Sequence, residues 1–240
     1  MINNTLLSAL VLLCYFSQPL SAVADQLGDG VSAFERGDYK SALNYLAPLA
    51  ESGNAGAQTE IGVMYHEGSG VAKDLKKAAY WYRLAADQEQ PVAQFNLGNS
   101  YASGEGVPKD EVEALMWWKR AASHDHRTSM YNIGNSYMFG QGVQRDAAEA
   151  IKWWRKAANR GYATAQFNLL VSYSHGPVAE RDLVEAFKWC TILSLRKSVG
   201  DEVTLLNDAK QECAKIKLNE SDKARALFFG MHWIEKHPMQ

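Results

Sequence analysis

Two groups of residues have types and spacing that could do chemistry. Ser194 and Lys197 form an S-x-x-K sequence, the spacing that places a lysine beside the nucleophile of penicillin-recognising enzymes. The companion S-D-N and K-T-G sequences do not occur in the chain. His124, Asp125 and His126 carry metal-binding atoms, but they fall in a predicted loop without a further ligand that the sequence can place. We therefore expect no catalytic residue, no metal site and no cofactor, and a solvated loop at 124–126.

Four aspartates recur every 36 residues and look like an array of carboxylates: Asp74, Asp110, Asp146 and Asp182. Each stands where a helix is expected to begin, and an aspartate side chain there accepts hydrogen bonds from the first free backbone N–H groups. A glutamate follows three residues later at the last three of these positions, as in a capping box. Helix capping therefore accounts for these aspartates without catalysis.

The same 36-residue period organises the rest of the chain. The most complete copy spans 93–128, and its alanine, glycine and aromatic positions return one period before and one period after it. A fixed period of about 20–50 residues indicates stacked supersecondary units. Each unit is expected to contain two helices around a glycine-rich turn, with glycines inside the first helix where the second approaches closely: Gly62, Gly98 and Gly134. Tryptophans of the second helix are expected in the core: Trp81, Trp117, Trp153 and Trp189.

The period divides the chain into four repeats between two terminal regions. A signal peptide is expected at 1–24, and a capping half-repeat of two helices at 25–56. The repeats follow at 57–92, 93–128, 129–164 and 165–197. C-terminal capping helices are expected within 198–240, at about 202–217 and 223–236, with Ala226, Phe229 and Trp233 on one side of the last helix.

The N-terminal segment has the composition of a secretory signal. Residues 1–24 contain no charged side chain, 6–16 is apolar, and Ala22-Val23-Ala24 offers a small-x-small cleavage site. We expect cleavage after Ala24, a periplasmic or secreted location, and no membrane span in the mature chain; an uncleaved anchor is the alternative. The formal net charge of −2 argues against nucleic acid as a partner.

Two cysteines, Cys190 and Cys213, remain after this cleavage. An oxidising compartment permits a disulfide between them. The alternative is two buried thiols, which are common in helical cores.

The repeated pattern resembles that of a known family. Residues 94–122 carry nearly all of A-x-A-Q-x-x-L-G-x-x-Y-x-x-G-x-G-V-x-x-D-x-x-x-A-x-x-W-Y-x-x-A-A, with Trp118 in place of the tyrosine. This pattern is similar to the Sel-one-like repeat (SLR), a relative of the tetratricopeptide repeat, and the match covers Ala57 to about Leu193. The resemblance implies an all-α fold, a right-handed α/α superhelical solenoid whose concave face is lined by the first helix of each repeat. It also implies a role as an adaptor or scaffold for protein complexes, often in bacterial envelope signalling or host interaction.

The resemblance to tetratricopeptide repeats also selects candidate partner-binding residues on the concave face. They are Phe95, Asn96, Asn99, Tyr131, Asn132, Asn135, Met138, Phe167 and Asn168. Asparagine both donates and accepts hydrogen bonds, and aromatic rings supply contact area at low entropic cost. The alternative is that these asparagines bond loops between repeats. A clamp for a peptide carboxylate is not expected, because Thr164 and Asn168 stand where its cationic groups would be.

These observations predict an exported, non-enzymatic scaffold that binds a partner protein or peptide. The alternatives are a periplasmic hydrolase similar to β-lactamases and a cell-wall polysaccharide-binding protein. A scaffold requires a groove with asparagines and aromatic residues, whereas an enzyme requires a nucleophile and a base within hydrogen-bond reach.

Overall fold

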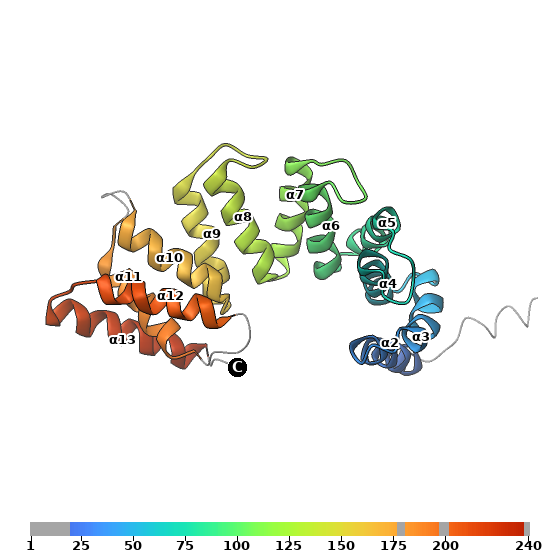
Figure 1. Cartoon of the computed structure of the whole chain (residues 1–240), viewed down its shortest axis with the longest axis horizontal. Helices are drawn as coiled ribbons and strands as arrows, with labels where there is room; N and C mark the ends of the chain where they lie inside the picture. The colour runs from blue at the N-terminus through green and yellow to red at the C-terminus, as the bar shows by residue number, and fades with distance from the viewer. Residues whose placement is uncertain (1–19, 177–180, 197–201, 238–240) are drawn as a thin grey trace, which may run out of the picture. The chain divides into compact units, whose positions relative to one another are not determined.

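The computed structural model describes residues 20–176, 181–196 and 202–237, and these residues form twelve α-helices and no strands (Figure 1). The all-α prediction is therefore confirmed. The chain divides into two compact units, Met1–Lys109 (unit 1) and Asp110–Gln240 (unit 2). Residues 1–19 of the expected signal peptide and Lys197 of the S-x-x-K sequence lie outside the described residues.

Each period holds two helices, as the sequence predicts. The described helices of unit 1 are α2 (Leu20–Glu35), α3 (Tyr39–Glu51), α4 (Ala55–Glu67), α5 (Leu75–Ala86) and α6 (Pro91–Ser103). Those of unit 2 are α7 (Glu111–Ser123), α8 (Arg127–Phe139), α9 (Ala147–Asn159), α10 (Ala163–His175), α11 (Leu183–Ser194), α12 (Glu202–Lys215) and α13 (Glu220–Lys236). Because α2 begins at Leu20, the expected cleavage after Ala24 would fall inside this helix.

Aspartates begin the second helix of all four repeats as predicted, and glycines end the first helix of three. Asp74, Asp110, Asp146 and Asp182 each accept a hydrogen bond from a backbone N–H near the start of the helix that follows. The first helix of a repeat ends at a glycine with left-handed backbone: Gly68, Gly104 and Gly140, with φ between 71° and 83°. Such a conformation favours glycine because it has no Cβ. Gly176 in the fourth repeat is instead extended, with φ of −60° and ψ of 170°.

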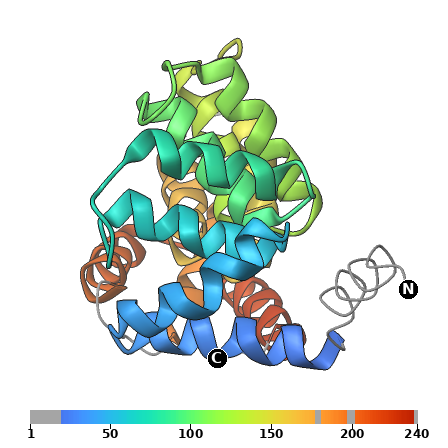
Figure 2. The same cartoon turned by 90° about the vertical axis from the view of Figure 1, so that its right-hand side faces the viewer.

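In unit 1, each helix packs on the next one along the chain, and Figure 2 shows this succession from α2 in blue towards α5 in teal. Leu46 of α3 and Met64 of α4 are fully buried in its core. A Cβ at Gly62 would lie 2.6 Å from the ring of Tyr82, so the ring of α5 rests on the bare backbone of α4. The expected close approach of the two helices at Gly62 is confirmed.

Unit 2 repeats this contact and adds a three-helix end. A Cβ at Gly134 in α8 would lie 2.4 Å from the indole of Trp154 in α9, which confirms the second close approach. At the C-terminal end, α11 packs against both α12 and α13, and α12 also contacts α10. The α11–α13 contact is close at Gly230, where a Cβ would lie 2.8 Å from Thr191.

The expected tryptophan core is only partly correct. Trp117 and Trp189 are buried, whereas Trp81 and Trp153 are half-buried. The residue directly after the tryptophan of the period is buried in the first three full repeats: Tyr82, Trp118 and Trp154. In the two hairpins described above, this second aromatic fills the space over the glycine of the first helix. The preceding residue lies about 100° away around the helix axis and therefore at the edge of the core.

The last helix begins earlier than predicted and packs through small residues. Its N-terminus lies three residues earlier than expected, because Asn219 accepts a hydrogen bond from the backbone N–H of Asp222 at 2.8 Å. Ala226 and Gly230 are buried, whereas Phe229 is 44% exposed. Of the three residues expected on one side of this helix, Phe229 is thus more exposed than the buried Ala226 and the half-buried Trp233.

No helix in the described ranges combines the length and the apolar composition that crossing a bilayer would require.

Candidate functional site

The nine residues predicted to bind a partner lie on the first helices of three successive repeats. Phe95, Asn96 and Asn99 are on α6 in unit 1. The other six belong to unit 2: Tyr131, Asn132, Asn135 and Met138 on α8, with Phe167 and Asn168 on α10. All nine are half-buried, so each keeps part of its surface accessible within its own unit. Their combination into one binding surface stays a prediction.

In unit 1, two of the predicted residues line a small pocket. The cavity, of about 170 Å³, is lined by Val63, His66, Glu67, Tyr82, Asn96, Asn99, Ser100 and Glu105. These residues come from α4, α5, α6 and the turn after α6. Sites for drug-sized ligands usually measure about 300–1,000 Å³, so this cavity suits the end of a side chain better than a whole ligand.

Carboxylates give this pocket a negative charge. Glu105 Oε2 lies 3.1 Å from His66 Nε2, and Glu67 Oε2 accepts a hydrogen bond from Ser69 Oγ at 3.1 Å. Glu60 lies two turns before Glu67 on α4. Burial raises the pKa of Glu60, and the neighbouring Glu35 and Glu67 raise it further because like charges disfavour ionisation.

Tyr82 forms the buried wall of the pocket. It is 3% exposed, and within residues 20–176, 181–196 and 202–237 its hydroxyl has no hydrogen-bond partner. Burial first, and then the charges of Glu67, Glu60 and Glu105, raise the pKa of Tyr82 far above its ordinary value. The phenol therefore stays neutral at physiological pH and lies in the field of three carboxylates.

In unit 2, Asn135 has a partner inside its own hairpin. Its Oδ1 accepts a hydrogen bond at 3.1 Å from Nε1 of Trp154, the residue at the position that Tyr82 holds in unit 1. The sequence left open whether these asparagines bind a partner or form internal bonds. For Asn135 the structure supplies an internal bond, to the second helix of the same repeat rather than to a loop.

Aromatic and cationic side chains gather near the start of α10. The rings of Tyr131 and Tyr162 are 5.1 Å apart. Arg127 and Arg196 line an adjoining cavity of about 240 Å³, where Arg196 Nη1 donates to the carbonyl oxygen of Gly161 at 3.1 Å. The two units therefore present different chemistry, with carboxylates in the pocket of unit 1 and guanidinium groups here.

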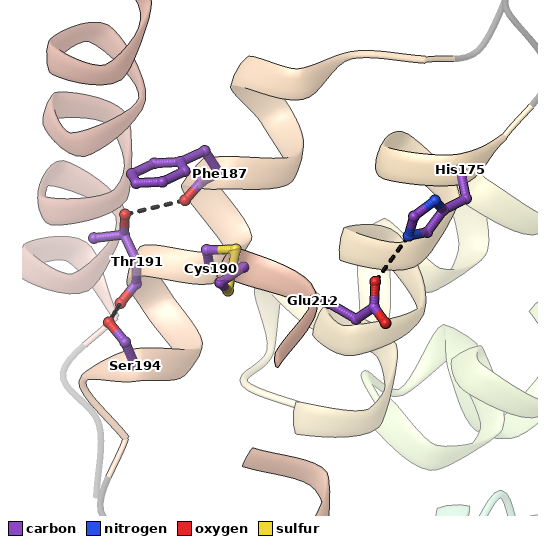
Figure 3. The surroundings of a disulfide bond; sticks show 7 residues. His175, Phe187, Cys190, Thr191, Ser194 and Glu212 are labelled. Atoms are coloured by element: carbon purple, nitrogen blue, oxygen red, sulfur yellow. Dashed lines mark hydrogen bonds and ion pairs between the residues drawn. A yellow bond between two sulfur atoms is a disulfide. The ribbon is translucent and has the colours of Figure 1, made fainter. Parts of the chain in front are cut away.

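Cys190 of α11 and Cys213 of α12 are joined by a disulfide, with their Cα atoms 5.7 Å apart (Figure 3). The bond lies beside an apolar cavity of about 440 Å³ between α11, α12 and α13. Ser194, the serine of the S-x-x-K sequence, donates its hydroxyl to the carbonyl oxygen of Thr191 in the preceding turn at 2.8 Å. That bond is typical of a helical serine and gives no sign of an activated nucleophile.

Two residues of the 124–126 segment make contacts within the chain. His126 is half-buried and caps α8, since its Nδ1 accepts a hydrogen bond from the backbone N–H of Ser129 at 3.3 Å. Asp125 forms an ion pair with Arg160. The expected solvated loop is therefore correct for His124 and Asp125, but wrong for His126, which the helix start holds in place. Across the described parts of the chain, no three metal-ligating residues come together.

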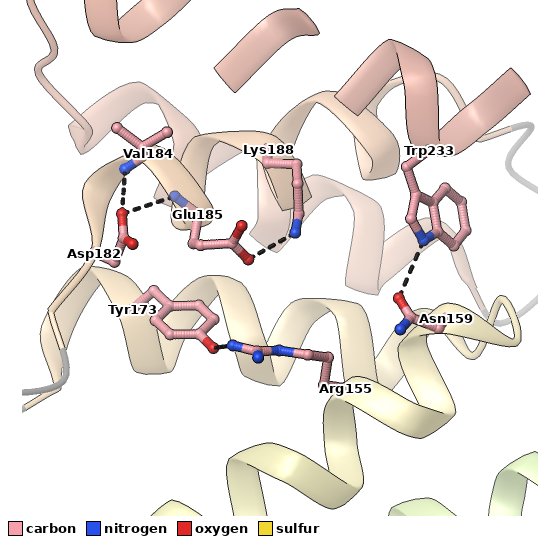
Figure 4. Close-up of polar contacts among 8 residues, drawn as sticks. All are labelled: Arg155, Asn159, Tyr173, Asp182, Val184, Glu185, Lys188 and Trp233. Atoms are coloured by element: carbon pink, nitrogen blue, oxygen red, sulfur yellow. Dashed lines mark hydrogen bonds and ion pairs between the residues drawn. The ribbon is translucent and has the colours of Figure 1, made fainter. Parts of the chain in front are cut away.

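The sequence interpretation did not predict a repeated contact between a basic residue and a tyrosine. In three repeats a basic residue of the second helix donates to the hydroxyl of a tyrosine 18 residues later, on the first helix of the next repeat: Arg83 to Tyr101, Lys119 to Tyr137 and Arg155 to Tyr173. Figure 4 shows the last of these contacts, and beside it Trp233 Nε1 donating to Asn159 Oδ1 at 3.1 Å. Both members of each pair recur with the 36-residue period, which is the signal that could have revealed them.

Only some of the residues that line the unit 1 pocket were predicted from the sequence. Asn96 and Asn99 were predicted, but Glu67, Tyr82 and Glu105 were not. No short spacing joins these three residues, because they come from the end of α4, from α5 and from the turn after α6.

Comparisons with known proteins point to one repeat family. A family model, the Sel1 repeat, matches residues 22–54, 55–89, 91–126, 128–162 and 163–193. The first match includes most of the segment expected to be a capping half-repeat. Among solved structures, the chain is similar to a Sel1 repeat protein from Oxalobacter formigenes, with 26% identity, coverage of 86% of this chain and 99% of that chain, and a TM-score of 0.64.

A second similar structure is a protective antigen present in uropathogenic Escherichia coli strains, which displays an SLR fold. The identity is 25%, the match covers 89% of this chain, and the TM-score is 0.66. The chain spans 53% of that protein, about half its length. No match was found among curated proteins.

Proposed function

The chain belongs to the Sel1 repeat family, and we propose on that basis that it is an exported scaffold that binds a partner protein or peptide. The binding surface would be the concave face expected for such repeats, formed by their first helices. The repeat fold is consistent with a protein-interaction module. The observation that carries the proposal is the unit 1 pocket, where Asn96 and Asn99 stand among further polar groups on a surface of first helices.

Capture of a partner tests this proposal. The immobilised full chain would be incubated with a bacterial periplasmic extract, alongside an Asn96→Ala/Asn99→Ala variant. The matched control is Asn44→Ala/Asn207→Ala, which removes two exposed asparagines outside the pocket. We expect the pocket variant to retain less of a captured protein than the control at equal melting temperature. Equal capture by both variants would contradict the proposal.

Asn135 is unsuitable for this test, although it belongs to the predicted surface. Replacing it with alanine removes the hydrogen-bond acceptor of Trp154, so a loss of binding could follow from a loss of stability. Melting temperature is likewise the check on folding for the Asn96→Ala/Asn99→Ala variant.

Export is the second part of the proposal. It is supported by the uncharged apolar N-terminus and by the Cys190–Cys213 disulfide, because such bonds persist mainly in oxidising compartments. The mass of the protein recovered from the periplasm tests it. We expect a chain that begins at Asp25 with its two cysteines oxidised, which would shorten α2 by five residues. A full-length chain with two free thiols would contradict export with cleavage.

We propose no catalytic activity for this chain. The bond from Ser194 to the carbonyl of its own helix supports a structural role for the S-x-x-K serine. Turnover of nitrocefin by the purified protein would favour the β-lactamase-like alternative. Co-sedimentation with purified peptidoglycan would favour the alternative of a cell-wall polysaccharide-binding protein.

A further inference from the structure

We propose that the pocket between α4 and α6 receives the cationic end of an arginine or lysine side chain from the partner. This inference rests on the proposed scaffold function and specifies its chemistry at one point of contact. It is carried by three features of the pocket: its set of acceptor groups, its unpartnered buried phenol, and its size.

The pocket is rich in hydrogen-bond acceptors. Glu67 and Glu105 contribute carboxylates, and the amide oxygen of Asn96 can also accept. No lysine or arginine lines the cavity, and His66 is its one basic lining residue. A guanidinium or ammonium group carries donors and no acceptor, so it complements this lining.

Tyr82 supplies the second, independent observation. Its side chain is 3% exposed and lines the pocket, and within the described ranges its hydroxyl has no hydrogen-bond partner. A donor brought by a ligand would satisfy the phenol oxygen. The chain uses this pairing elsewhere, since Arg83 donates to the hydroxyl of Tyr101 and Arg155 to that of Tyr173.

The existing contacts leave room for such a ligand. Glu105 pairs with His66 through Oε2, and Glu67 accepts one hydrogen bond from Ser69. Each carboxylate has two oxygens and about four lone-pair sites, so both can accept further bonds. A cavity of about 170 Å³ admits one side-chain end, which makes this a point of specificity within a larger contact.

Titration of the ¹⁵N-labelled full chain with three blocked tripeptides tests the inference. The probes are acetyl-Gly-Arg-Gly-amide, its lysine analogue, and its citrulline analogue, which keeps the shape of arginine without its charge. We expect saturable shifts of backbone amides in α4 and α6 with the arginine or lysine probe. The citrulline probe should bind about tenfold more weakly or worse, because hydrogen bonds to charged groups are stronger than neutral ones.

Matched variants separate the pocket from general electrostatics. Glu67→Gln/Glu105→Gln should weaken binding of the cationic probe by about tenfold or more. Glu51→Gln/Asp87→Asn removes the same charge from exposed positions of unit 1 outside the pocket and should leave binding nearly unchanged. If the pocket variant does not fold, the comparison of arginine with citrulline on the unmodified chain still decides.

Two results would overturn the inference: equal binding of citrulline and arginine, or undiminished binding of the cationic probe by Glu67→Gln/Glu105→Gln. Its failure is distinguishable from failure of the scaffold proposal. If the cationic probe does not bind but capture still depends on Asn96 and Asn99, the inference fails alone. If the probe binds as expected but capture is independent of Asn96 and Asn99, the scaffold proposal fails while the cation site stands.

Discussion

The hydrogen bond between Trp154 and Asn135 should contribute measurably to the stability of unit 2. The indole Nε1 lies 3.1 Å from Asn135 Oδ1, and Trp154 is only 4% exposed. Leaving a buried donor unpaired costs about 1–3 kcal/mol. Alanine recovers up to about 0.7 kcal/mol through its higher helix propensity. We therefore expect Asn135→Ala to lower the free energy of unfolding by about 0.3–2.3 kcal/mol.

A double-mutant cycle isolates this bond from the other effects of each substitution. Trp154→Phe removes the donor but keeps an aromatic ring over Gly134. In that background Asn135→Ala should be neutral or stabilising by up to about 0.7 kcal/mol, because no buried indole donor is left unpaired and only the helix propensity of alanine acts. Urea unfolding of the four proteins, followed by circular dichroism, should give a coupling energy of about 1–2 kcal/mol.

A coupling energy below about 0.5 kcal/mol would refute this reasoning, because it is what independent sites show. The slopes of the urea transitions must also agree, since a changed slope reports an altered denatured or native state rather than a lost bond. Asn44→Ala on the exposed face of α3 is the control, and it should change stability only through helix propensity.

Three further predictions concern stability. Cys213→Ala should lower the free energy of unfolding by about 3 kcal/mol in urea melts, because its bond to Cys190 closes a loop with a separation of 23 residues; a dithiol reductant should reproduce the loss in the unmodified chain. Gly142→Ala should lower the melting temperature much more than Gly140→Ala, although both residues have positive φ. A Cβ at Gly142 would lie 2.2 Å from a backbone carbonyl oxygen, whereas a Cβ at Gly140 would lie no nearer than 3.5 Å to any neighbour. Burial, with a smaller effect of the neighbouring Arg127, lowers the pKa of His126 below 6.5. As the pH decreases, the unfolded chain therefore binds this proton before the folded chain does, and the free energy of unfolding should fall through and below pH 6.5. In urea melts at different pH values, His126→Asn, which can cap the helix without titrating, should remove that dependence.

Much of the fold was predictable because its signals are local. Gly104 ends a helix and Asp110 begins the next, and each effect depends on a few neighbouring residues. Because the same residues recur every 36 positions, the assignments made in one repeat could be extended to the others. The tryptophan error arose where packing decided: Trp153 lies at the edge of the core because Trp154 occupies the space over Gly134.

The candidate site was predictable only in part, for the same reason. The period placed Asn96 and Asn99 on the first helix of a repeat, where a binding surface was expected. It did not show that Asn96 would line a pocket, or that the amide oxygen of Asn135 would accept a hydrogen bond from a buried indole. These features depend on which aromatic residue lies opposite and on how closely the two helices approach.

The sequence by itself determined the repeating helical hairpin, its caps and turns, and the family to which they belong, because these follow from residues that are near one another in the chain. Only the tertiary structure decided that Glu67, Tyr82 and Glu105 share one pocket with Asn96 and Asn99, and that Cys190 meets Cys213. These contacts join separate helices, and they depend on the distance between helix axes and on side-chain directions, which residue spacing alone does not encode.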